Sequence, residues 1–467
     1  MSESDTAQES DTVQESHPHL ARYLARQRWF GAGEADFVVV SVQALKWLSD
    51  PLGGRGVRVE LVTIETASGS RQTYNVPLSY RSAQLESISY GLVGVESWSE
   101  GEFFVYDAMH DPEARSALIA GFFAEASGGD LSYTRTAELE IEVDSPSVVL
   151  AVEQSNTSIV VDETVLLKLF RKVVPGRNPD IEIHAVLAER GDESVAALQG
   201  WISTDLGDPA GDYDLAMAQR FLRTATDGWE SARASVRDLL AEPDLVAGEA
   251  GGDFAADAER LGATTAHVHE LLAELLPTDT WEQAELRTLA ARLNARLDEA
   301  LTQAPAIGAH ATQIRARYDA ILDIDATIQA QRVHGDFHLG QTLRTTAGWK
   351  IIDFEGEPSK SLDERTHLDS AARDIAGMLR SLDYAAHSVL LQTGVSSESQ
   401  QQQAADWVAH NREAFLRGYG FTTDRVPAIL LGAYEVDKAV YEVVYEIDHR
   451  PDWVDLPMRA LDRLLGE

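Results

Sequence analysis

Two aspartates flank a short polar turn in the segment that carries the clearest chemistry of this chain. Asp336 lies in His-Gly-Asp-Phe-His-Leu-Gly-Gln, residues 334–341, and Asp353 follows the apolar pair Ile-Ile. Moving a phosphoryl group requires a carboxylate that takes the proton of an incoming hydroxyl, and hard oxygen ligands that hold Mg²⁺ on the phosphates. The pattern predicts Asp336 as the catalytic base, with Gln341 and Asp353 as metal ligands.

The interval from Asp336 to Gln341 equals the one between the catalytic Asp and the metal-binding Asn of protein kinases. A second kinase-like feature is Lys168, inside Val-Leu-Leu-Lys-Leu-Phe, where an ammonium group is costly to bury without a partner. Kinases pair such a lysine with a Glu on the next helix, and here that helix is expected to begin after Asn178. We therefore expect Lys168 to contact ATP and Glu182 to pair with it. The alternative is a solvent-facing Lys168 and a Glu182 that only favours the helix N-terminus.

A polar turn precedes the Lys168 strand. The residues Glu-Gln-Ser-Asn-Thr-Ser, 153–158, separate two short strand-like runs. Backbone N–H groups of such a turn can bind phosphate oxygens, although polar hairpin turns are common. The candidate nucleotide-binding residues of this turn are Ser155, Asn156, Thr157 and Ser158.

The composition excludes several classes of function. The 467 residues are 44% hydrophobic and carry a formal net charge of −37, and that charge argues against a nucleic-acid partner. The absence of cysteine excludes disulfides and thiolate metal sites. No run of about 18 apolar residues and no secretory signal pattern occurs, so we expect no membrane partner and a cytoplasmic location. A salt-rich habitat and simple solubility both remain open as reasons for the acidic charge.

The chain divides by its hydrophobic periodicity into a sheet-rich half and a helical half. The first 16 residues form an acidic polar tail, and strands at 37–48, 57–65 and 71–77 predict a small antiparallel sheet. The spacing predicts a helix over 103–126 and alternation over 131–143, and from 229 onward it is helical except at 331–357. We expect an α+β, bilobal, protein-kinase-like fold: a cap subdomain at 17–130, a mixed-sheet nucleotide-binding subdomain at 131–220, a hinge at 221–228 and a helical lobe at 229–467.

Several longer stretches resemble the actinobacterial maltokinases, relatives of aminoglycoside phosphotransferases and choline kinases. The likeness runs from about residue 20 to the end, and four stretches carry it: Gln-Arg-Val-His-Gly-Asp-Phe-His-Leu-Gly-Gln, Ile-Ile-Asp-Phe-Glu-Gly-Glu-Pro, Arg-Asp-Ile-Ala-Gly-Met-Leu-Arg-Ser-Leu-Asp-Tyr-Ala-Ala and Leu-Gly-Ala-Tyr-Glu-Val-Asp-Lys-Ala-Val-Tyr-Glu. The resemblance implies a kinase-like fold with an N-terminal cap, and ATP and Mg²⁺ as cofactors. It also implies transfer to the anomeric hydroxyl of maltose, which gives maltose 1-phosphate for α-glucan (glycogen) synthesis, often beside trehalose synthase. Asp-Phe-Glu in place of Asp-Phe-Gly, and the lack of a Gly-rich loop, depart from protein kinases but fit the small-molecule branch.

The sugar-binding residues are predicted from the last long helix and from that resemblance. Aromatic and carboxylate side chains recur there at three- and four-residue spacing, which suits sugar binding and core packing equally, and the resemblance implies Tyr441, Glu442 and Trp453 as the sugar contacts. His338 and Asp369 are further substrate candidates. In the alternative, the tyrosines pack in the core, the glutamates pair with Lys438 or Arg450, and His338 is a hydrogen-bonded turn residue. Arg373 and Asp374 are expected outside the site, as a pair supporting the catalytic loop.

Two other functions stay open. A kinase of another acceptor, such as glucosamine, a related amino sugar or an aminoglycoside, would share the same phosphoryl-transfer residues. A non-enzymatic binding protein on a degenerate kinase fold would lack some of them. Lys168, Asp336, Gln341 and Asp353 are all present, which disfavours that second possibility.

Overall fold

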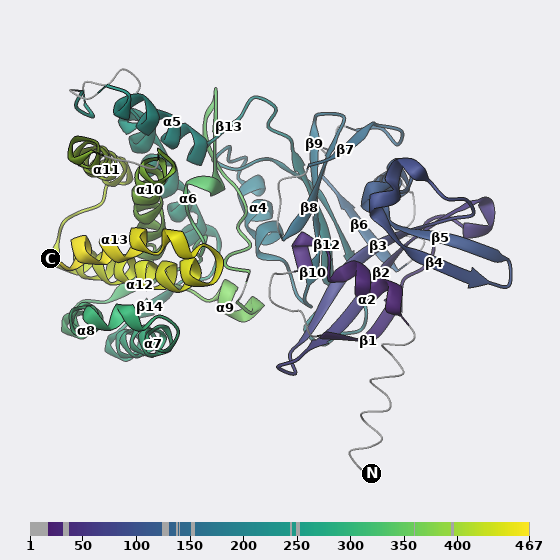
Figure 1. Ribbon diagram of the computed structural model, residues 1–467, viewed down its shortest axis with the longest axis horizontal. Coiled ribbons are helices and arrows are strands. Elements are labelled where there is room, and N and C mark those ends of the chain that lie inside the picture. The colour runs from purple at the N-terminus through teal and green to yellow at the C-terminus, as the bar shows by residue number, and fades with distance from the viewer. Residues whose placement is uncertain are drawn as a thin grey trace, which may run out of the picture. The chain divides into compact units, whose positions relative to one another are not determined.

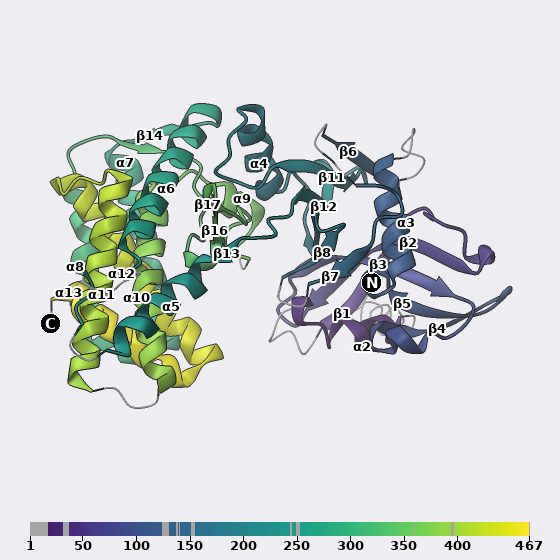
Figure 2. The same cartoon turned by 90° about the horizontal axis from the view of Figure 1, so that it is seen from above.

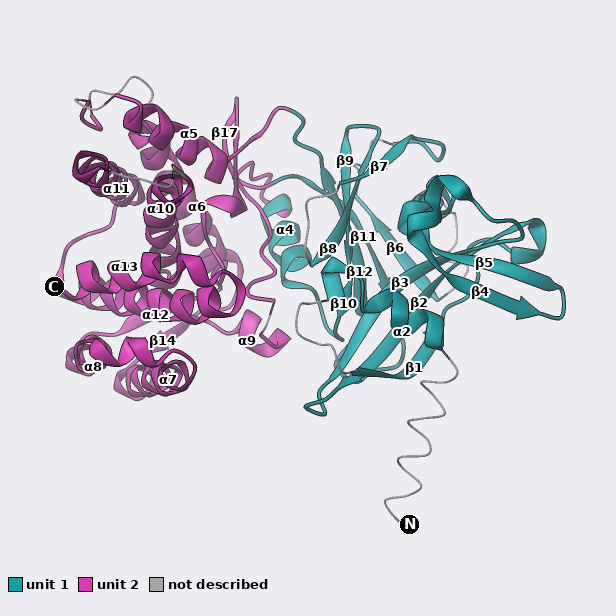
Figure 3. Cartoon of the chain, in the orientation of Figure 1, with its two compact units in different colours: residues 1–188, 196–223 teal, residues 189–195, 224–467 magenta. Residues whose placement is uncertain are grey.

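The chain forms two compact units in the computed structural model. The structure describes residues 17–30, 37–123, 130–136, 139, 141–150, 155–242, 245–248, 253–358, 360–393 and 397–466, so the predicted tail at 1–16 lies outside it. Unit 1 comprises residues 1–188 and 196–223, and unit 2 comprises 189–195 and 224–467 (Figure 3). The chain crosses from unit 1 to unit 2 for the last time after Arg223, within the segment 221–228 that was expected to be a hinge.

Unit 1 begins with a six-stranded antiparallel sheet in the order β1-β2-β3-β5-β4, with β10 added to β3 (Figure 1). Its strands are β1 (Phe37–Ala44), β2 (Arg55–Thr66), β3 (Arg71–Arg81), β4 (Leu92–Trp98), β5 (Gly101–Asp107) and β10 (Lys172–Val173). The side chains of β2 project from both faces of the sheet: Val59 and Leu61 lie in one hydrophobic core, and Val62 and Ile64 lie in the other. Helix α2 (Pro18–Leu24) contributes Leu20 and Leu24 to the second of these cores. The predicted small antiparallel sheet is confirmed and is larger than expected.

The second sheet of unit 1 has the order β6-β11-β12-β9-β8-β7, and all its pairs are antiparallel. Its strands are β6 (Leu131–Arg135), β7 (Ser147–Val149), β8 (Asn156–Val161), β9 (Val165–Phe170), β11 (Leu198–Thr204) and β12 (Tyr213–Arg220). Helices α3 (Pro112–Ala120) and α4 (Pro179–Glu189) complete the unit, and apolar residues of both sheets and both helices share one core. Lys168 therefore lies on an interior strand, between β12 and β8.

Unit 2 is mainly helical, and α6 packs beside α11 and α10 beside α12 (Figure 2). Its helices are α5 (Gly228–Leu240), α6 (Ala255–Leu275), α7 (Gln283–Gln303), α8 (Ala311–Asp319), α9 (Leu362–Thr366), α10 (Ala372–Thr393), α11 (Glu398–Tyr419), α12 (Arg425–His449) and α13 (Asp455–Leu465). Its short strands are β13 (Thr226–Asp227), β14 (Asp279–Trp281), β15 (Ile328–Ala330), β16 (Thr342–Thr345) and β17 (Gly348–Ile351). The helical half, interrupted around 331–357, is confirmed.

Two predicted elements differ from the structure. The helix expected over 103–126 is wrong at its start, because β5 runs to Asp107 and α3 begins only at Pro112. Asp111 caps α3 by accepting hydrogen bonds from the N–H groups of Glu113 and Ala114, and proline at the first helical position favours the same start. The strand expected over 131–143 ends at Arg135.

Among the residues described, no helix has both the length and the apolar composition that crossing a bilayer requires.

Candidate active site

A hairpin in unit 2 places Gln341 and Asp353 opposite one another. Strands β16 and β17 pair antiparallel, with Thr342 opposite Ile351, and the N–H of Ile352 donates to the carbonyl of Gln341 at 3.0 Å. At the open end, Gln341 Nε2 donates to Asp353 Oδ2 at 2.9 Å. Asp353 has φ 66°, a left-handed conformation that non-glycine residues adopt mainly where surrounding structure imposes it, often at functional sites. The hairpin thus holds an amide and a carboxylate together, and each has a hard oxygen atom that can bind a metal ion.

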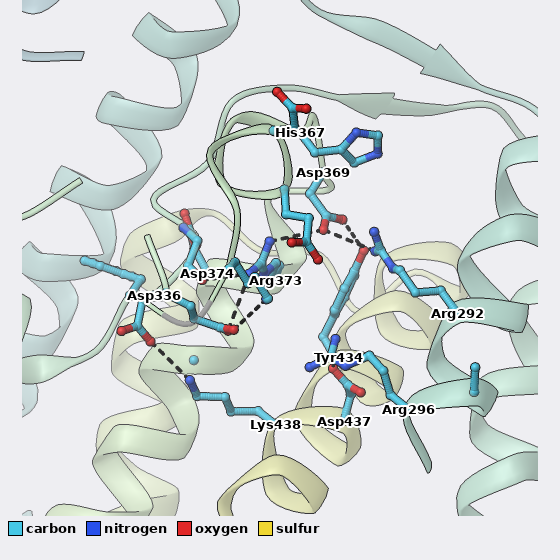
Figure 4. A pocket seen from close by; sticks show the side chains of 18 of the residues that line it. Arg292, Arg296, Asp336, His367, Asp369, Arg373, Asp374, Tyr434, Asp437 and Lys438 are labelled. Carbon is cyan, nitrogen blue, oxygen red and sulfur yellow. Dashed lines mark hydrogen bonds and ion pairs between the residues drawn. The ribbon is translucent and has the colours of Figure 1, made fainter. Parts of the chain in front are cut away.

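Asp336 is held as a carboxylate beside a lysine. Lys438 Nζ on α12 lies 3.2 Å from Asp336 Oδ1 (Figure 4). Burial raises the pKa of Asp336, but the charges of Lys438, His338 and His334 outweigh it and lower that pKa to about 2. The pKa of Lys438 is raised, because the Asp336 carboxylate opposes the effect of burial. Asp336 is therefore ionised and able to accept a proton at neutral pH.

The loop that carries Asp336 is fixed through its backbone by the start of α10. Asp374 accepts hydrogen bonds from the N–H groups of His334 (2.7 Å) and Gly335 (2.9 Å), and Arg373 Nη2 donates to the carbonyl of Gly335 at 2.8 Å. A Cβ on Gly377 would lie 2.4 Å from the carbonyl oxygen of Phe337, so glycine is required where α10 passes the loop. Arg373 and Asp374 support the catalytic loop as expected, each through a backbone group, but both also line the cavity described below and so do not lie outside the site.

The partner predicted for Lys168 is corrected by the structure. Lys168 Nζ lies 3.0 Å from Asp180 Oδ2 rather than pairing with Glu182, and both charged side chains are almost fully buried. The reason is helical periodicity: Asp180, His184 and Leu187 share the buried face of α4, whereas Glu182 lies off that face. His184 Nδ1, 3.1 Å from Asp180 Oδ1, belongs to the same cluster.

The polar turn before β8 is described only in part. Residues 151–154 lie outside the described residues, and Asn156, Thr157 and Ser158 form the start of β8. Ser158 pairs directly with Lys168 in the sheet, and the hydroxyl of Thr157 accepts a hydrogen bond from Arg171 Nε at 2.8 Å. Phosphate binding by residues 155–158 stays a prediction.

A cavity of about 730 Å³ in unit 2 reaches Asp336 (Figure 4). Its walls come from α7, from residues 357–374 and from α12, and Lys438 and Asp369 line it. Asp369, 1% exposed, accepts hydrogen bonds from the hydroxyl of Tyr434, from Arg292 Nη2 (3.3 Å) and from Arg373 Nη1 (3.5 Å). The size and the convergent polar groups suit a small ligand rich in hydroxyl groups.

The other predicted substrate residues do not line this cavity. His338 Nδ1 accepts the N–H of Gly340 at 3.1 Å, which matches the turn-histidine alternative. Glu442 Oε2 accepts two bonds from Arg380, at 2.7 and 3.1 Å, and the guanidinium of Arg450 lies 4.6 Å from the ring centroid of Trp453. Tyr441 is 36% exposed and lies beside Lys438. Sugar contacts by these four residues stay predictions.

Sequence reasoning missed most of the cavity wall. Arg296 Nη1 lies 2.9 Å from Asp437 Oδ2, and Lys360 Nζ lies 2.6 Å from Glu357 Oε2. Burial raises the pKa of Asp437 despite Arg296, whereas Lys360 and neighbouring cations lower that of Glu357 against burial. The one available signal was the four-residue spacing of Arg292 and Arg296 in a chain with 76 Asp and Glu but only 39 Lys and Arg.

Two family models match the chain. The maltokinase N-terminal cap domain matches residues 23–111, and the phosphotransferase enzyme family matches residues 233–428. The second match contains the Asp336 loop, the hairpin and the start of α12.

Curated relatives and solved structures agree with these matches. A glucosamine kinase of Streptacidiphilus jiangxiensis is 31% identical over 334 residues, 68% of this chain and 73% of the relative, and one of Mycolicibacterium smegmatis is 27% identical over 68% of this chain and 79% of its own. The structure of a glucosamine kinase in complex with glucosamine, ADP and inorganic phosphate aligns with a TM-score of 0.66 at 23% identity, covering 98% of this chain and 99% of that one. A second crystal form gives a TM-score of 0.70 at 23% identity over the same shares. These two structural likenesses establish the kinase-like fold, and the 31% identical relative together with the family models shows that the chain belongs to the phosphotransferase enzyme family and carries a maltokinase-type N-terminal cap domain.

Proposed function

We propose that this phosphotransferase moves the γ-phosphoryl group of ATP to a hydroxyl group of a small sugar. The observation that carries the proposal is the ionised Asp336 at a polar cavity of about 730 Å³, in the loop that leads into the hairpin of Gln341 and Asp353. A base that is charged at neutral pH, next to room for a polyhydroxylated acceptor, suits alcohol phosphorylation.

Each polar group has a role in the reaction. The acceptor oxygen forms a bond to the γ-phosphorus while the bond from that phosphorus to the β,γ-bridging oxygen breaks, so ADP leaves. Asp336 orients the hydroxyl and takes its proton. Lys168, held by Asp180, neutralises phosphate charge on the nucleotide. Asp374 and Arg373 keep the Asp336 loop in place through its backbone.

Gln341 and Asp353 fit a magnesium ion by donor chemistry. Both offer hard oxygen atoms, and they are held side by side at the end of a paired hairpin. Gln341 uses its amide nitrogen in the bond to Asp353, so its carbonyl oxygen is the atom suited to a cation. Bound there, Mg²⁺ would offset the negative charge on the transferring phosphoryl group.

The acceptor we favour is an amino sugar of the glucosamine class. Both curated relatives are glucosamine kinases, one of them 31% identical. Carboxylates outnumber lysines and arginines on the cavity wall, which accommodates an ammonium group. The whole chain is acidic as well, with 76 Asp and Glu against 39 Lys and Arg. The acidic cavity is therefore compatible with an amino sugar but does not distinguish it from other sugars, and the preference rests on the two relatives.

Maltose is the second candidate, and the match to the maltokinase cap favours it. If maltose is the acceptor, the product is maltose 1-phosphate, the enzyme serves α-glucan synthesis, and trehalose synthase is a candidate partner. Under both candidates ATP is the donor, so we propose a cytoplasmic location.

An acceptor panel decides between the candidates. The protein is incubated with ATP, Mg²⁺ and one sugar at a time, and products are identified by mass. Asp336→Asn is the test variant and Asp325→Asn, at an exposed position outside the cavity, is the matched control. Glucosamine phosphate formed by the wild type and the control but not by Asp336→Asn supports the proposal. Maltose phosphate alone would shift the choice to maltose, and no sugar-dependent use of ATP with any acceptor would overturn the function.

A further inference from the structure

The strand that carries Lys168 continues directly into the sheet of the cap, residues 23–111. Strand β9 ends at Phe170, Arg171 follows, and β10 (Lys172–Val173) pairs with Thr73 and Tyr74 of β3. Asn75 strengthens this junction: its side-chain amide donates to the carbonyls of Phe170 (3.0 Å) and Leu215 (3.1 Å). One uninterrupted segment therefore belongs to both sheets of unit 1.

Arg171 lies at this junction and binds both sides of it. Its side chain is 1% exposed, Nη2 donates to Asp107 Oδ2 at 2.8 Å, and Nε donates to Thr157 Oγ1 at 2.8 Å. Asp107 ends β5 of the cap and also accepts the hydroxyl of Tyr23 at 2.7 Å. A chain of hydrogen bonds thus runs from the first helix of the cap, through Asp107 and Arg171, to Thr157.

Thr157 connects this series of hydrogen bonds to the strands that carry Lys168 and the predicted nucleotide-binding residues. It lies in β8 opposite Leu169, next to the pair that Ser158 forms with Lys168. It is also one of the residues of the turn predicted to bind phosphate. A shift of the Arg171 side chain would therefore act on the strand that leads out of that turn.

Stability alone is a poor explanation for a buried arginine in this position. Taking a guanidinium out of water is costly, and a buried ion pair often contributes little net stability compared with apolar side chains. Among the described residues, Arg171 Nη1 has no hydrogen-bond partner, which adds to the cost. What the arrangement does provide is a fixed geometry between the cap and β8.

We infer that Arg171 is a positioning residue through which the cap, by way of Asp107, sets the position of β8, the strand that carries the predicted nucleotide-binding residues Asn156, Thr157 and Ser158. The inference rests on the proposed use of ATP. It assigns the cap a part in nucleotide affinity, separate from the acceptor cavity, whose lining residues all belong to unit 2.

The test changes the cap side and the turn side of the network separately. Asp107→Asn keeps the shape of the side chain but removes the charge that faces Arg171, and Thr157→Val removes the hydroxyl that Arg171 reaches. Each should raise the KM for ATP roughly tenfold, the effect of losing one hydrogen bond to a charged group. Asp107→Asn, which changes a residue outside the predicted nucleotide contacts, should leave kcat and the acceptor KM within about twofold. Thr204→Val is the matched control, because Thr204 is a buried threonine of the same sheet that donates to Asp130 instead.

The double variant separates positioning from general loosening of the fold. Because Asp107 and Thr157 act through one guanidinium, the combined effect on the KM for ATP should be clearly smaller than the product of the single effects. Tyr23→Phe, a milder change at Asp107, should raise that KM about threefold and serves if Asp107→Asn fails to fold. Folded cap-side variants with an unchanged KM for ATP, or fully multiplicative effects, would overturn the inference. Failure of the wild type to use ATP would instead sink the proposed function, and direct ADP binding by calorimetry would then test the network by itself.

Discussion

The catalytic loop with its hairpin and the wall of the acceptor cavity are organised differently. The first lies within residues 334–353, and its groups are positioned by backbone hydrogen bonds to Asp374 and by strand pairing. The second is assembled from α7, residues 357–374 and α12, and its cations Arg292, Arg296 and Lys438 each face a carboxylate from another segment. Chemistry encoded in one short stretch can be recognised as a motif, whereas specificity encoded across distant segments cannot.

The largest effect is expected at the centre of the first region. Asp336→Asn keeps the shape of the side chain but removes the proton acceptor, so kcat should fall about 10³-fold, within the usual contribution of general base catalysis. Steady-state kinetics measures the loss, and calorimetry with ADP should show unchanged nucleotide binding. A variant that keeps a tenth of the wild-type rate would contradict the role of Asp336.

The second largest effect is expected at Asp374, which holds the Asp336 loop in place but takes no part in the proton transfer. The N–H groups of His334 and Gly335 donate to different oxygens of Asp374, so Asp374→Asn leaves one of them with a weaker, neutral acceptor and the other facing an amide nitrogen. We therefore expect kcat to fall by roughly 30-fold and the free energy of unfolding by about 2 kcal/mol. Kinetics and denaturant titration measure the two changes. If stability falls while kcat stays at the wild-type value, the loop does not depend on this anchor.

The cavity wall should affect acceptor binding rather than rate. Asp369→Asn disturbs the acceptor of Tyr434, Arg292 and Arg373, so the acceptor KM should rise about tenfold while the KM for ATP stays unchanged. The two substrates are varied independently to measure this. A change confined to the KM for ATP would place Asp369 outside the acceptor site.

The dependence of activity on pH tests how Lys438, on the cavity wall, affects Asp336 in the catalytic loop. The pKa of Asp336 is about 2, below its ordinary value of 3.8, so its ionised form stabilises the folded state above pH 4 and this contribution, about 2 kcal/mol, is lost as the pH falls toward 2. Lys438→Met removes the main opposing charge and leaves burial to raise the pKa of Asp336. The acid limb of kcat/KM should therefore move to higher pH. The control is Lys46→Met, which removes an exposed ion pair with Asp130, and an unmoved limb in Lys438→Met would contradict the assignment.

The smallest kinetic effect is expected at Glu442. Its ion pair with Arg380, which is 2% exposed, predicts that Glu442→Gln lowers the free energy of unfolding by roughly 2 kcal/mol but changes the acceptor KM less than twofold. Denaturant titration and kinetics again measure both. A large rise in the acceptor KM would instead support the prediction from the sequence that Glu442 contacts the sugar.

The sequence predicted local features well and tertiary pairing poorly. The proximity of Gln341 and Asp353 could be predicted because their spacing along the chain reflects one hairpin, while the roles of these residues and of Asp336 stay predictions. Asp180 was missed in favour of Glu182 because both stand in the first turn of α4, and only the packed face of the helix decides which one reaches Lys168. Arg292 was missed because its partner Asp369 lies 77 residues away. The same limit applies to the fold: residues 103–107, expected to be helical, form the end of β5 because this strand pairs with β3 and β4.

The central claim is that Asp336 delivers a sugar hydroxyl to the γ-phosphate of ATP, and ³¹P NMR of the complete reaction tests it most directly. With ATP, Mg²⁺ and glucosamine or maltose, we expect a phosphate ester signal coupled to a sugar proton, formed in equal amount with ADP and missing when Asp336→Asn replaces the wild type. Release of inorganic phosphate at the same rate with or without sugar, or an ester signal of undiminished rate from the variant, would contradict the account.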